Sequence, residues 1–285
     1  MKTIGIIALS GACEKEKVLN AKTFFESNGY KVKLSNNIYD KTRYLAGSDT
    51  SKLNELKSFF EDKEIDIIMC VRGGYGAIRL VENIDYEIIK NNKKIFCGFS
   101  DVTALLLMIY KKTGMITYHG PMATSDFGDI TDKNLYTYQN FKNAISSSDL
   151  NFVGNKTYKE GKAKGIIWGG NLATVVSLCG LDFIPNEDFI FFAEDLNEPV
   201  YKIDKMFQQL INIKQFRNYC KGIVLGDFLN NGNDNWLEEY WKELSEKLDI
   251  PVVSGFRITH NLEKVTIPIG RRAEIDGLNL KVANI

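Results

Sequence analysis

Short apolar runs alternate with helix-like segments through the first 125 or so residues of the chain. Residues 2–10, 65–71 and 93–98 each contain a short apolar run, whereas residues 51–63 and 101–114 have the periodicity of helices. Apolar runs of this kind are typical of strands buried on both faces, in a parallel sheet covered by helices. In such sheets, ligands bind at the carboxyl ends of the strands.

The alternation predicts an α/β fold with two domains. Residues 1–125 are expected to form a parallel α/β domain of the Rossmann or flavodoxin type. Residues 126–160 are polar and are interpreted as the passage between domains. Residues 161–285 are expected to form a mixed β/α domain with barrel-like β content and a final hairpin at Asp276-Gly277.

Composition excludes several classes of function. The 285 residues contain 36 Lys plus Arg and 36 Asp plus Glu, which argues against nucleic acid or an anionic membrane surface as the main partner. No apolar stretch approaches the ~18 residues of a membrane span, and the start of the chain is typical of a strand and not of a secretion signal. The five cysteines lack the paired spacing of a disulfide framework or zinc site. We therefore expect a reduced, cytoplasmic protein without a metal.

The segment KKIFCGFSDVTALLLMIYKK passes from an apolar run through a sharp turn into a helix. This is the context of a nucleophile elbow, with Ser100 as the candidate nucleophile. Val102 occupies the position of the usual second glycine. Serine is also a common helix N-cap, so Ser100 is predicted both to cap the helix and to act as the nucleophile. An alternative, a glutaminase-like enzyme with Cys97 as the nucleophile, requires the turn to fall at Cys97, where the apolar run continues.

A glycine-rich turn follows the apolar run at residues 65–70. In VRGGYGAIRL, consecutive glycines at the end of a strand allow backbone N–H groups to point into a cleft, as an oxyanion hole or phosphate cradle requires. The segment lacks the third glycine of a dinucleotide fingerprint and the lysine of a P-loop.

A nucleophilic serine needs a base, and the chain has only His119 and His260. A carboxylate normally orients that base, and Glu194 and Asp195 directly follow the apolar run FIFFA. Spacing alone does not choose between these two acids. The order serine, acid, histidine along the chain also occurs in α/β-hydrolases.

Several multi-residue motifs together resemble those of the LD-carboxypeptidases. They are RGGYGAIRLV, GFSDVTALL, YHGPM, GIIWGGNLATV, FFAEDLNEPVYKIDKMFQQL and the His260 segment ending in TIPIG. The resemblance runs nearly from end to end. The family includes murein tetrapeptide carboxypeptidases and microcin C immunity peptidases, and the motifs are more similar to the murein branch.

The resemblance implies a serine peptidase with a Ser100, Glu194 and His260 triad. It places the oxyanion hole at the backbone N–H of Asp101 with that of Gly73 or Gly74. It further implies a homodimer that needs no cofactor and hydrolyses the L,D bond before the terminal D-alanine of murein tetrapeptides. The family's Gly-His pair is Thr259-His260 here. His119 does not match the family's base.

The groups that bind the substrate stay open in the sequence. Arg72, Arg79 and Arg271 are candidates for the terminal carboxylate, and Trp168 is a candidate for the cleft lining. Two alternative functions also remain. One is a microcin-immunity-type peptidase that acts on acidic aminoacyl-nucleotide conjugates, and the other is a non-catalytic protein that binds a small ligand.

Overall fold

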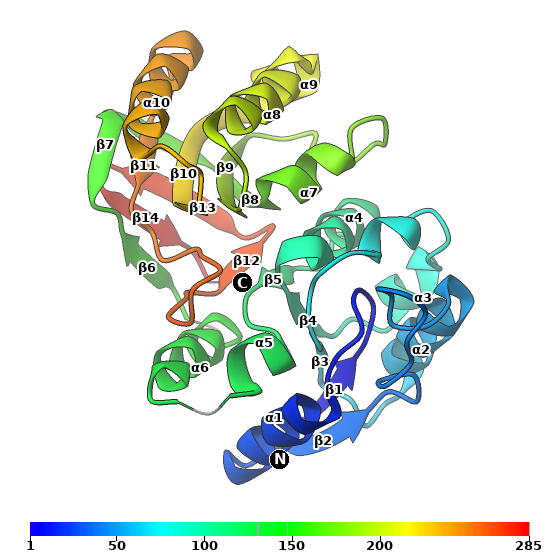
Figure 1. The fold of residues 1–285 in the computed structure, drawn as a ribbon. Helices are drawn as coiled ribbons and strands as arrows, with labels where there is room; N and C mark the ends of the chain where they lie inside the picture. The colour runs from blue at the N-terminus through cyan, green and yellow to red at the C-terminus, as the bar shows by residue number, and fades with distance from the viewer. Residues whose placement is uncertain (130, 147, 285) are drawn as a thin grey trace.

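Two β-sheets organise the chain in the computed structural model, which describes residues 1–129, 131–146 and 148–284. The first sheet gathers most of the N-terminal half of the chain and the second most of the C-terminal half (Figure 1). The predicted α/β class is therefore confirmed. No helix in these ranges is both long and apolar enough to cross a membrane.

The first sheet has six strands in the order β12-β5-β4-β3-β1-β2. Its first five strands in the chain are parallel and lie in the flavodoxin-like order 2-1-3-4-5. The strand bounds are β1 (Thr3–Ile7), β2 (Lys31–Leu34), β3 (Ile67–Cys70), β4 (Ile95–Gly98), β5 (Thr117–His119) and β12 (Ile267–Ile269). Strands β1 and β3 are buried at every residue, which explains their uninterrupted apolar sequences.

The second sheet has eight strands in the order β6-β14-β13-β8-β9-β10-β11-β7. Strands β8 to β11 run parallel, and antiparallel strands flank them on both sides. The expected barrel-like closure is not confirmed, because no pairing among the described residues joins β6 to β7. The bounds are β6 (Leu150–Val153), β7 (Lys156–Lys159), β8 (Lys162–Asn171), β9 (Phe189–Leu196), β10 (Cys220–Leu229), β11 (Val252–Ser254), β13 (Arg272–Asp276) and β14 (Asn279–Val282).

Helices cover the sheets, and one helix lies between them. Helix α4 contacts β4, β5 and β12 of the first sheet and β8 of the second. Its residues 103–109 are all buried, as expected for a helix that is apolar on every side. The helix bounds are α1 (Lys15–Ser27), α2 (Asp49–Glu61), α3 (Tyr86–Asn91), α4 (Thr103–Thr113), α5 (Ala123–Phe127), α6 (Lys133–Ala144), α7 (Leu172–Ser177), α8 (Val200–Asn212), α9 (Lys214–Tyr219) and α10 (Asp234–Leu248), with 3₁₀ turns η1 (Ala77–Arg79) and η2 (Ser100–Val102).

Strand pairing crosses the predicted passage between domains. Strand β12, far along the chain, adds to the first sheet by antiparallel pairing with β5 (Figure 1). The polar stretch of residues 126–160 contains α6, β6 and β7, and these two strands belong to the second sheet. The C-terminal half of the chain thus contributes a strand to the first sheet, so strand pairing as well as side-chain contacts joins the two halves.

A buried ion pair anchors the segment that leads into β12. Lys264 Nζ contacts Asp126 Oδ1 of α5, and these side chains are 4% and 0% exposed. Asp126 Oδ2 also accepts a hydrogen bond of 2.8 Å from the Met122 backbone N–H. Both oxygens of the carboxylate are therefore satisfied, as a buried charge requires.

We expect Asp126→Asn to lower the free energy of unfolding by about 3 kcal/mol, because it leaves the Lys264 ammonium buried without its counter-charge. The matched control is Asp129→Asn, whose pair with Lys17 is exposed and should contribute at most about 1 kcal/mol. Urea denaturation measures both variants. Equal, small effects in the two variants would contradict the structural importance of the buried pair.

Candidate functional site

Ser100 lies at a sharp turn between strand β4 and helix α4. Its φ angle is 60°, in the left-handed region that residues other than glycine rarely adopt. The 3₁₀ turn η2 begins at Ser100 and leads directly into α4. This strand–turn–helix arrangement is that of the predicted nucleophile elbow.

The predicted capping role of Ser100 is wrong. The residues at the N-cap positions of η2 and α4 are Phe99 and Val102, and neither helix start has a side-chain cap. An N-cap residue normally has an extended backbone, whereas Ser100 is left-handed. The Ser100 hydroxyl therefore caps neither helix start.

The glycine-rich turn after β3 lies directly against Ser100. A Cβ atom placed on Gly73 would be 3.0 Å from Ser100 Cβ and 3.1 Å from its Oγ. Behind the elbow, a Cβ on Gly98 would be 2.8 Å from Val102 Cγ1. Glycine at both positions therefore allows the two backbone segments to approach the serine.

Asp101 ties the elbow to the glycine-rich turn. Its buried carboxylate accepts a 2.8 Å hydrogen bond from the Ala77 backbone N–H at the start of η1. On the other side of the turn, the Gly11 N–H donates to the Gly73 carbonyl at 3.1 Å. The glycine-rich turn is thus braced beside the serine by hydrogen bonds.

Glu194 and His260 form a close pair between the end of β9 and the segment before β12. His260 Nδ1 is 2.7 Å from Glu194 Oε2. The Glu194 side chain is fully buried, whereas that of His260 is 15% exposed. A buried carboxylate on Nδ1 fixes the ring orientation and leaves Nε2 free to act as a base.

Asp195 points into a different environment from Glu194, because neighbouring strand residues face opposite sides of a sheet. Its carboxylate accepts hydrogen bonds from Asn171 Nδ2 at 2.9 Å and from the backbone N–H groups of Ala173 and Leu196, both at 2.8 Å. Burial raises the pKa of Asp195 to about 6 despite these donors. The structure therefore pairs His260 with Glu194, a choice that spacing left open.

Phe99 connects the elbow to the histidine. Its ring lies 5.0 Å from the His260 ring in a T-shaped contact. Lys264 Nζ lies 3.9 Å from the centre of the same Phe99 ring, a cation–π contact. The hydrogen bonds of the described residues do not join Ser100 to His260, and such contacts often tighten only when substrate binds.

His119 is a buried histidine on β5 that lies close to the same aromatic side chains. It makes T-shaped contacts with Phe99 at 6.0 Å and Phe192 at 5.2 Å. Burial lowers the pKa of His119 to about 4, so its ring is neutral at pH 7. His119 is thus packed in the core.

Two candidate arginines bind elsewhere in the structure. Arg271 is buried and donates to the backbone carbonyls of Ala283, Ala144 and Ser148. Arg79 donates three hydrogen bonds to the Asp49 carboxylate, with distances of 2.6 to 3.1 Å. The expectation that Arg271 binds substrate is therefore corrected, since its donors are used within the protein.

Trp168 and Cys97 also belong to the core. Trp168 is fully buried and packs against the rings of Phe183, Phe189 and Phe191, so it does not line a cleft. Cys97 lies within β4, and burial raises the pKa of its thiol well above the usual value. A buried neutral thiol is a poor nucleophile, which argues against the Cys97 alternative.

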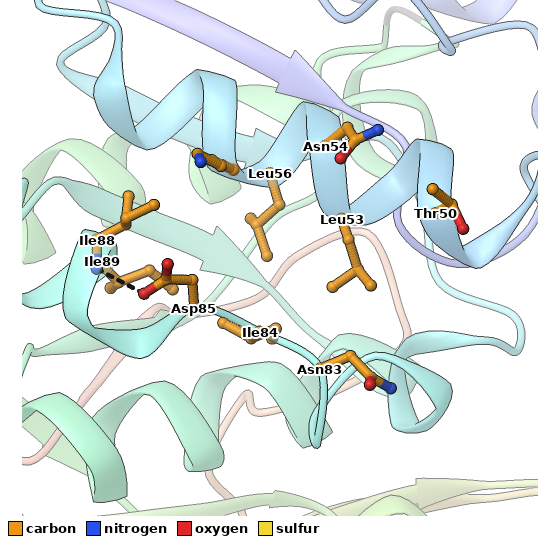
Figure 2. Close-up of a pocket in the computed structure, with 10 residues that line it drawn as sticks. Thr50, Leu53, Asn54, Leu56, Asn83, Ile84, Asp85, Ile88 and Ile89 are labelled. Atoms are coloured by element: carbon orange, nitrogen blue, oxygen red, sulfur yellow. Dashed lines mark hydrogen bonds between the residues drawn. The ribbon is translucent and has the colours of Figure 1, made fainter.

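A hydrophobic hollow of about 250 Å³ lies between α2 and the segment that includes α3 (Figure 2). Leu53, Leu56 and Ile84 contribute apolar side chains to it. Asp85 at its edge accepts a hydrogen bond from the Ile88 N–H as the cap of α3. Its lining includes neither histidine, serine nor cysteine, and its one carboxylate, Asp85, caps α3, so it is not a candidate active site.

A second crevice, of about 530 Å³, lies beside the glycine-rich turn and includes Arg72 and Gly74.

Among the described residues, no group of three or more His, Cys, Asp or Glu side chains is arranged to hold a metal ion.

Polar contacts that were not predicted from the sequence join the two sheets near this site. Thr103 Oγ1 accepts a 3.2 Å hydrogen bond from the Asn171 N–H, and Asn171 also contacts Asp195. A Cβ on Gly170 would be 2.5 Å from Thr103 Cγ2. Two glycines before an asparagine, in WGGNL, were the available signal of a close approach at the end of a strand.

Comparisons with known proteins identify the family of the chain. The profile of the LD-carboxypeptidase N-terminal domain matches residues 4–120, and that of the C-terminal domain matches residues 164–275. A probable murein peptide carboxypeptidase of Bacillus subtilis (strain 168) is 31% identical, over 96% of this chain and 88% of the relative. The microcin C7 self-immunity protein MccF of Escherichia coli is 29% identical, over 99% of this chain and 92% of the relative.

A solved structure extends the likeness to three dimensions. The muramoyltetrapeptide carboxypeptidase of Oxalobacter formigenes superposes with a TM-score of 0.87 at 27% identity, and the match covers 99% of each chain. Both domain profiles and a relative above 30% identity thus cover nearly the whole sequence. The chain belongs to the LD-carboxypeptidase family and is a carboxypeptidase of the hydrolase class.

Proposed function

We propose that this carboxypeptidase is a serine enzyme that removes the terminal D-alanine of murein tetrapeptides during recycling of cell-wall fragments. The observation that carries the proposal is the 2.7 Å contact between Glu194 and His260. The His260 ring also packs against the ring of Phe99, the residue that precedes the left-handed Ser100. Relatives named for murein peptides support the substrate class.

The first half of the reaction is acylation. His260 Nε2 takes the proton of Ser100 Oγ, which attacks the carbonyl carbon on the L side of the L,D peptide bond. The backbone N–H groups of Asp101 and of Gly73 or Gly74 bind the oxyanion, and each such donor contributes roughly 3 kcal/mol. Glu194 stabilises the imidazolium through Nδ1.

The second half releases the products. The protonated His260 donates its proton to the nitrogen of D-alanine as the carbon–nitrogen bond breaks, which leaves an ester on Ser100. Water then loses a proton to His260 and attacks the ester carbonyl. The ester bond breaks, and Ser100 recovers its proton from the imidazolium.

Arg72 is the candidate for the terminal carboxylate of the substrate. It precedes Gly73, which lies against Ser100, and its Nη1 donates to the Ala12 carbonyl at 3.2 Å. The other two arginines considered from sequence are engaged by Asp49 or by backbone carbonyls. A guanidinium at this position provides further N–H donors for a carboxylate.

The relative MccF is a microcin C7 self-immunity protein, and its likeness to this chain keeps a second substrate class in view. That class is an acidic aminoacyl group joined to a nucleotide. The same serine, glutamate and histidine would perform the same acyl transfer on it.

We expect Ser100→Ala to abolish D-alanine release from murein tetrapeptide, because the variant has no group that can form the ester. Mass spectrometry of the peptide products measures the reaction, and circular dichroism with a thermal melt checks folding. D-alanine release at the wild-type rate by Ser100→Ala would contradict the nucleophile assignment. A wild-type protein that binds the tetrapeptide without turnover would support a binding protein instead, and cleavage of acidic aminoacyl conjugates alone would support the MccF-like substrate.

The two neighbouring acids of β9 provide a matched comparison. We expect Glu194→Gln to lower kcat by at least about 10³-fold, because an amide no longer stabilises the imidazolium. Asp195→Asn makes the same chemical change one residue away, at a carboxylate bonded to Asn171 and backbone N–H groups, and should retain kcat within about tenfold. Steady-state kinetics distinguish the two. Equal losses of kcat in the two variants would remove the special role of Glu194.

A further inference from the structure

The crevice beside the glycine-rich turn lies at the point where the strand order of the first sheet reverses. In the order β2-β1-β3-β4-β5, the loops after β1 and β3 leave neighbouring strands at the same carboxyl edge. Open parallel sheets bind their ligands at this position. The crevice of about 530 Å³ is lined by residues 11–14 after β1, residues 72, 74 and 75 after β3, and residues 41, 43 and 44 of the segment after β2.

Positive charge dominates the lining of this crevice. Lys41, Arg43 and Arg72 contribute three cations, against a single acidic residue, Glu14. Among the described residues, none of these three cations forms a salt bridge, although nearby cations such as Lys17 and Arg79 do. The crevice therefore has positive charge that the protein's own carboxylates do not neutralise.

Two exposed tyrosines border the cations. Tyr44 and Tyr75 are 58% and 45% exposed, and their rings meet at 5.7 Å in a T-shaped contact. Arg43 has a left-handed φ of 58°, and its guanidinium carbon lies 5.7 Å from the centre of the Tyr44 ring. These groups combine apolar surface with charge, which suits a peptide chain that carries a carboxylate.

The crevice is adjacent to the candidate nucleophile. Gly73 lies between Arg72 and Gly74 in the chain, and a Cβ on Gly73 would be 3.0 Å from Ser100 Cβ. The Gly11 N–H, from the loop after β1, donates to the Gly73 carbonyl at 3.1 Å. A substrate held at Ser100 therefore has part of its length within reach of the crevice.

We propose that Lys41 and Arg43 extend the site at Arg72 into an anion subsite, which binds a second carboxylate of the substrate besides the terminal one and makes this carboxypeptidase selective for acidic peptides. The inference rests on the proposed function and deepens it. Arg72 is the cation nearest in sequence to the glycine beside Ser100, whereas Lys41 and Arg43 come from the segment after β2. This second pair is thus the part of the subsite that can be removed without changing the elbow or its brace.

The test uses the double variant Lys41→Gln/Arg43→Gln and murein tetrapeptides in which each carboxylate is amidated in turn. We expect the double variant to raise KM for the unmodified peptide at least about tenfold with kcat within about twofold, because only a binding interaction is lost. The peptide amidated at the bound carboxylate should show a raised KM with the wild-type protein and little further change with the variant. That substrate identifies which carboxylate enters the crevice.

The matched control is Lys57→Gln/Lys205→Gln, which removes the same charge from exposed lysines on α2 and α8. Its KM should stay within about twofold of the wild-type value. Equal KM values for wild type and Lys41→Gln/Arg43→Gln would overturn the subsite, and so would an equal rise in the control.

Binding to the Ser100→Ala protein separates this inference from the proposed function. Calorimetry compares that protein with its Lys41→Gln/Arg43→Gln derivative, using two probes. The first is murein tetrapeptide, and the second is glutamyl sulfamoyl guanosine, in which an acidic aminoacyl group is joined to a nucleoside. Absence of D-alanine release by the wild type rejects the proposed function, yet at least tenfold weaker binding of either probe by the derivative still supports the subsite. Unchanged Kd values, or no binding of either probe, would overturn it.

Discussion

The left-handed backbone of Ser100 is the constraint on which the rest of the site depends. A residue other than glycine in this conformation costs of order 1–3 kcal/mol, so surrounding contacts must hold it. The Asp101 carboxylate supplies one such contact at the Ala77 N–H, and Gly73 leaves space for the serine side chain. The same contacts bring the glycine-rich turn to the elbow. The strained serine backbone and the close approach of the glycine-rich turn are therefore two results of one arrangement.

Contacts between the two sheets determine how the other residues of the site are positioned. Thr103 of α4 accepts the Asn171 N–H at the end of β8, and Asn171 in turn donates to Asp195 on β9. Strand β12 adds to the first sheet after the segment that carries His260 and Lys264. These connections place residues from both halves of the chain around Phe99. Asp195 thereby supports the position of β9, while Glu194 contacts the histidine.

Much of this arrangement could be predicted from the sequence, for physical reasons. Uninterrupted apolar strands indicate a parallel sheet, and an apolar run followed by GFSD and a helix indicates an elbow. The choice between Glu194 and Asp195 depends on which face of β9 is directed at His260, and that face is fixed only by pairing with β8 and β10. The antiparallel addition of β12 is a contact between distant segments with no local signal. Burial of Trp168 likewise depends on three phenylalanines brought together by the fold.

Covalent labelling of the native protein shows whether Ser100 is an activated nucleophile, because it reports activation of one hydroxyl without reference to any substrate. The protein would be treated with a fluorophosphonate, digested and mapped by mass spectrometry. The account predicts that Ser100 is the labelled residue and that loss of activity follows its labelling. Inactivation with Ser100 unmodified, or with the label on Cys97 or another residue, would contradict the account.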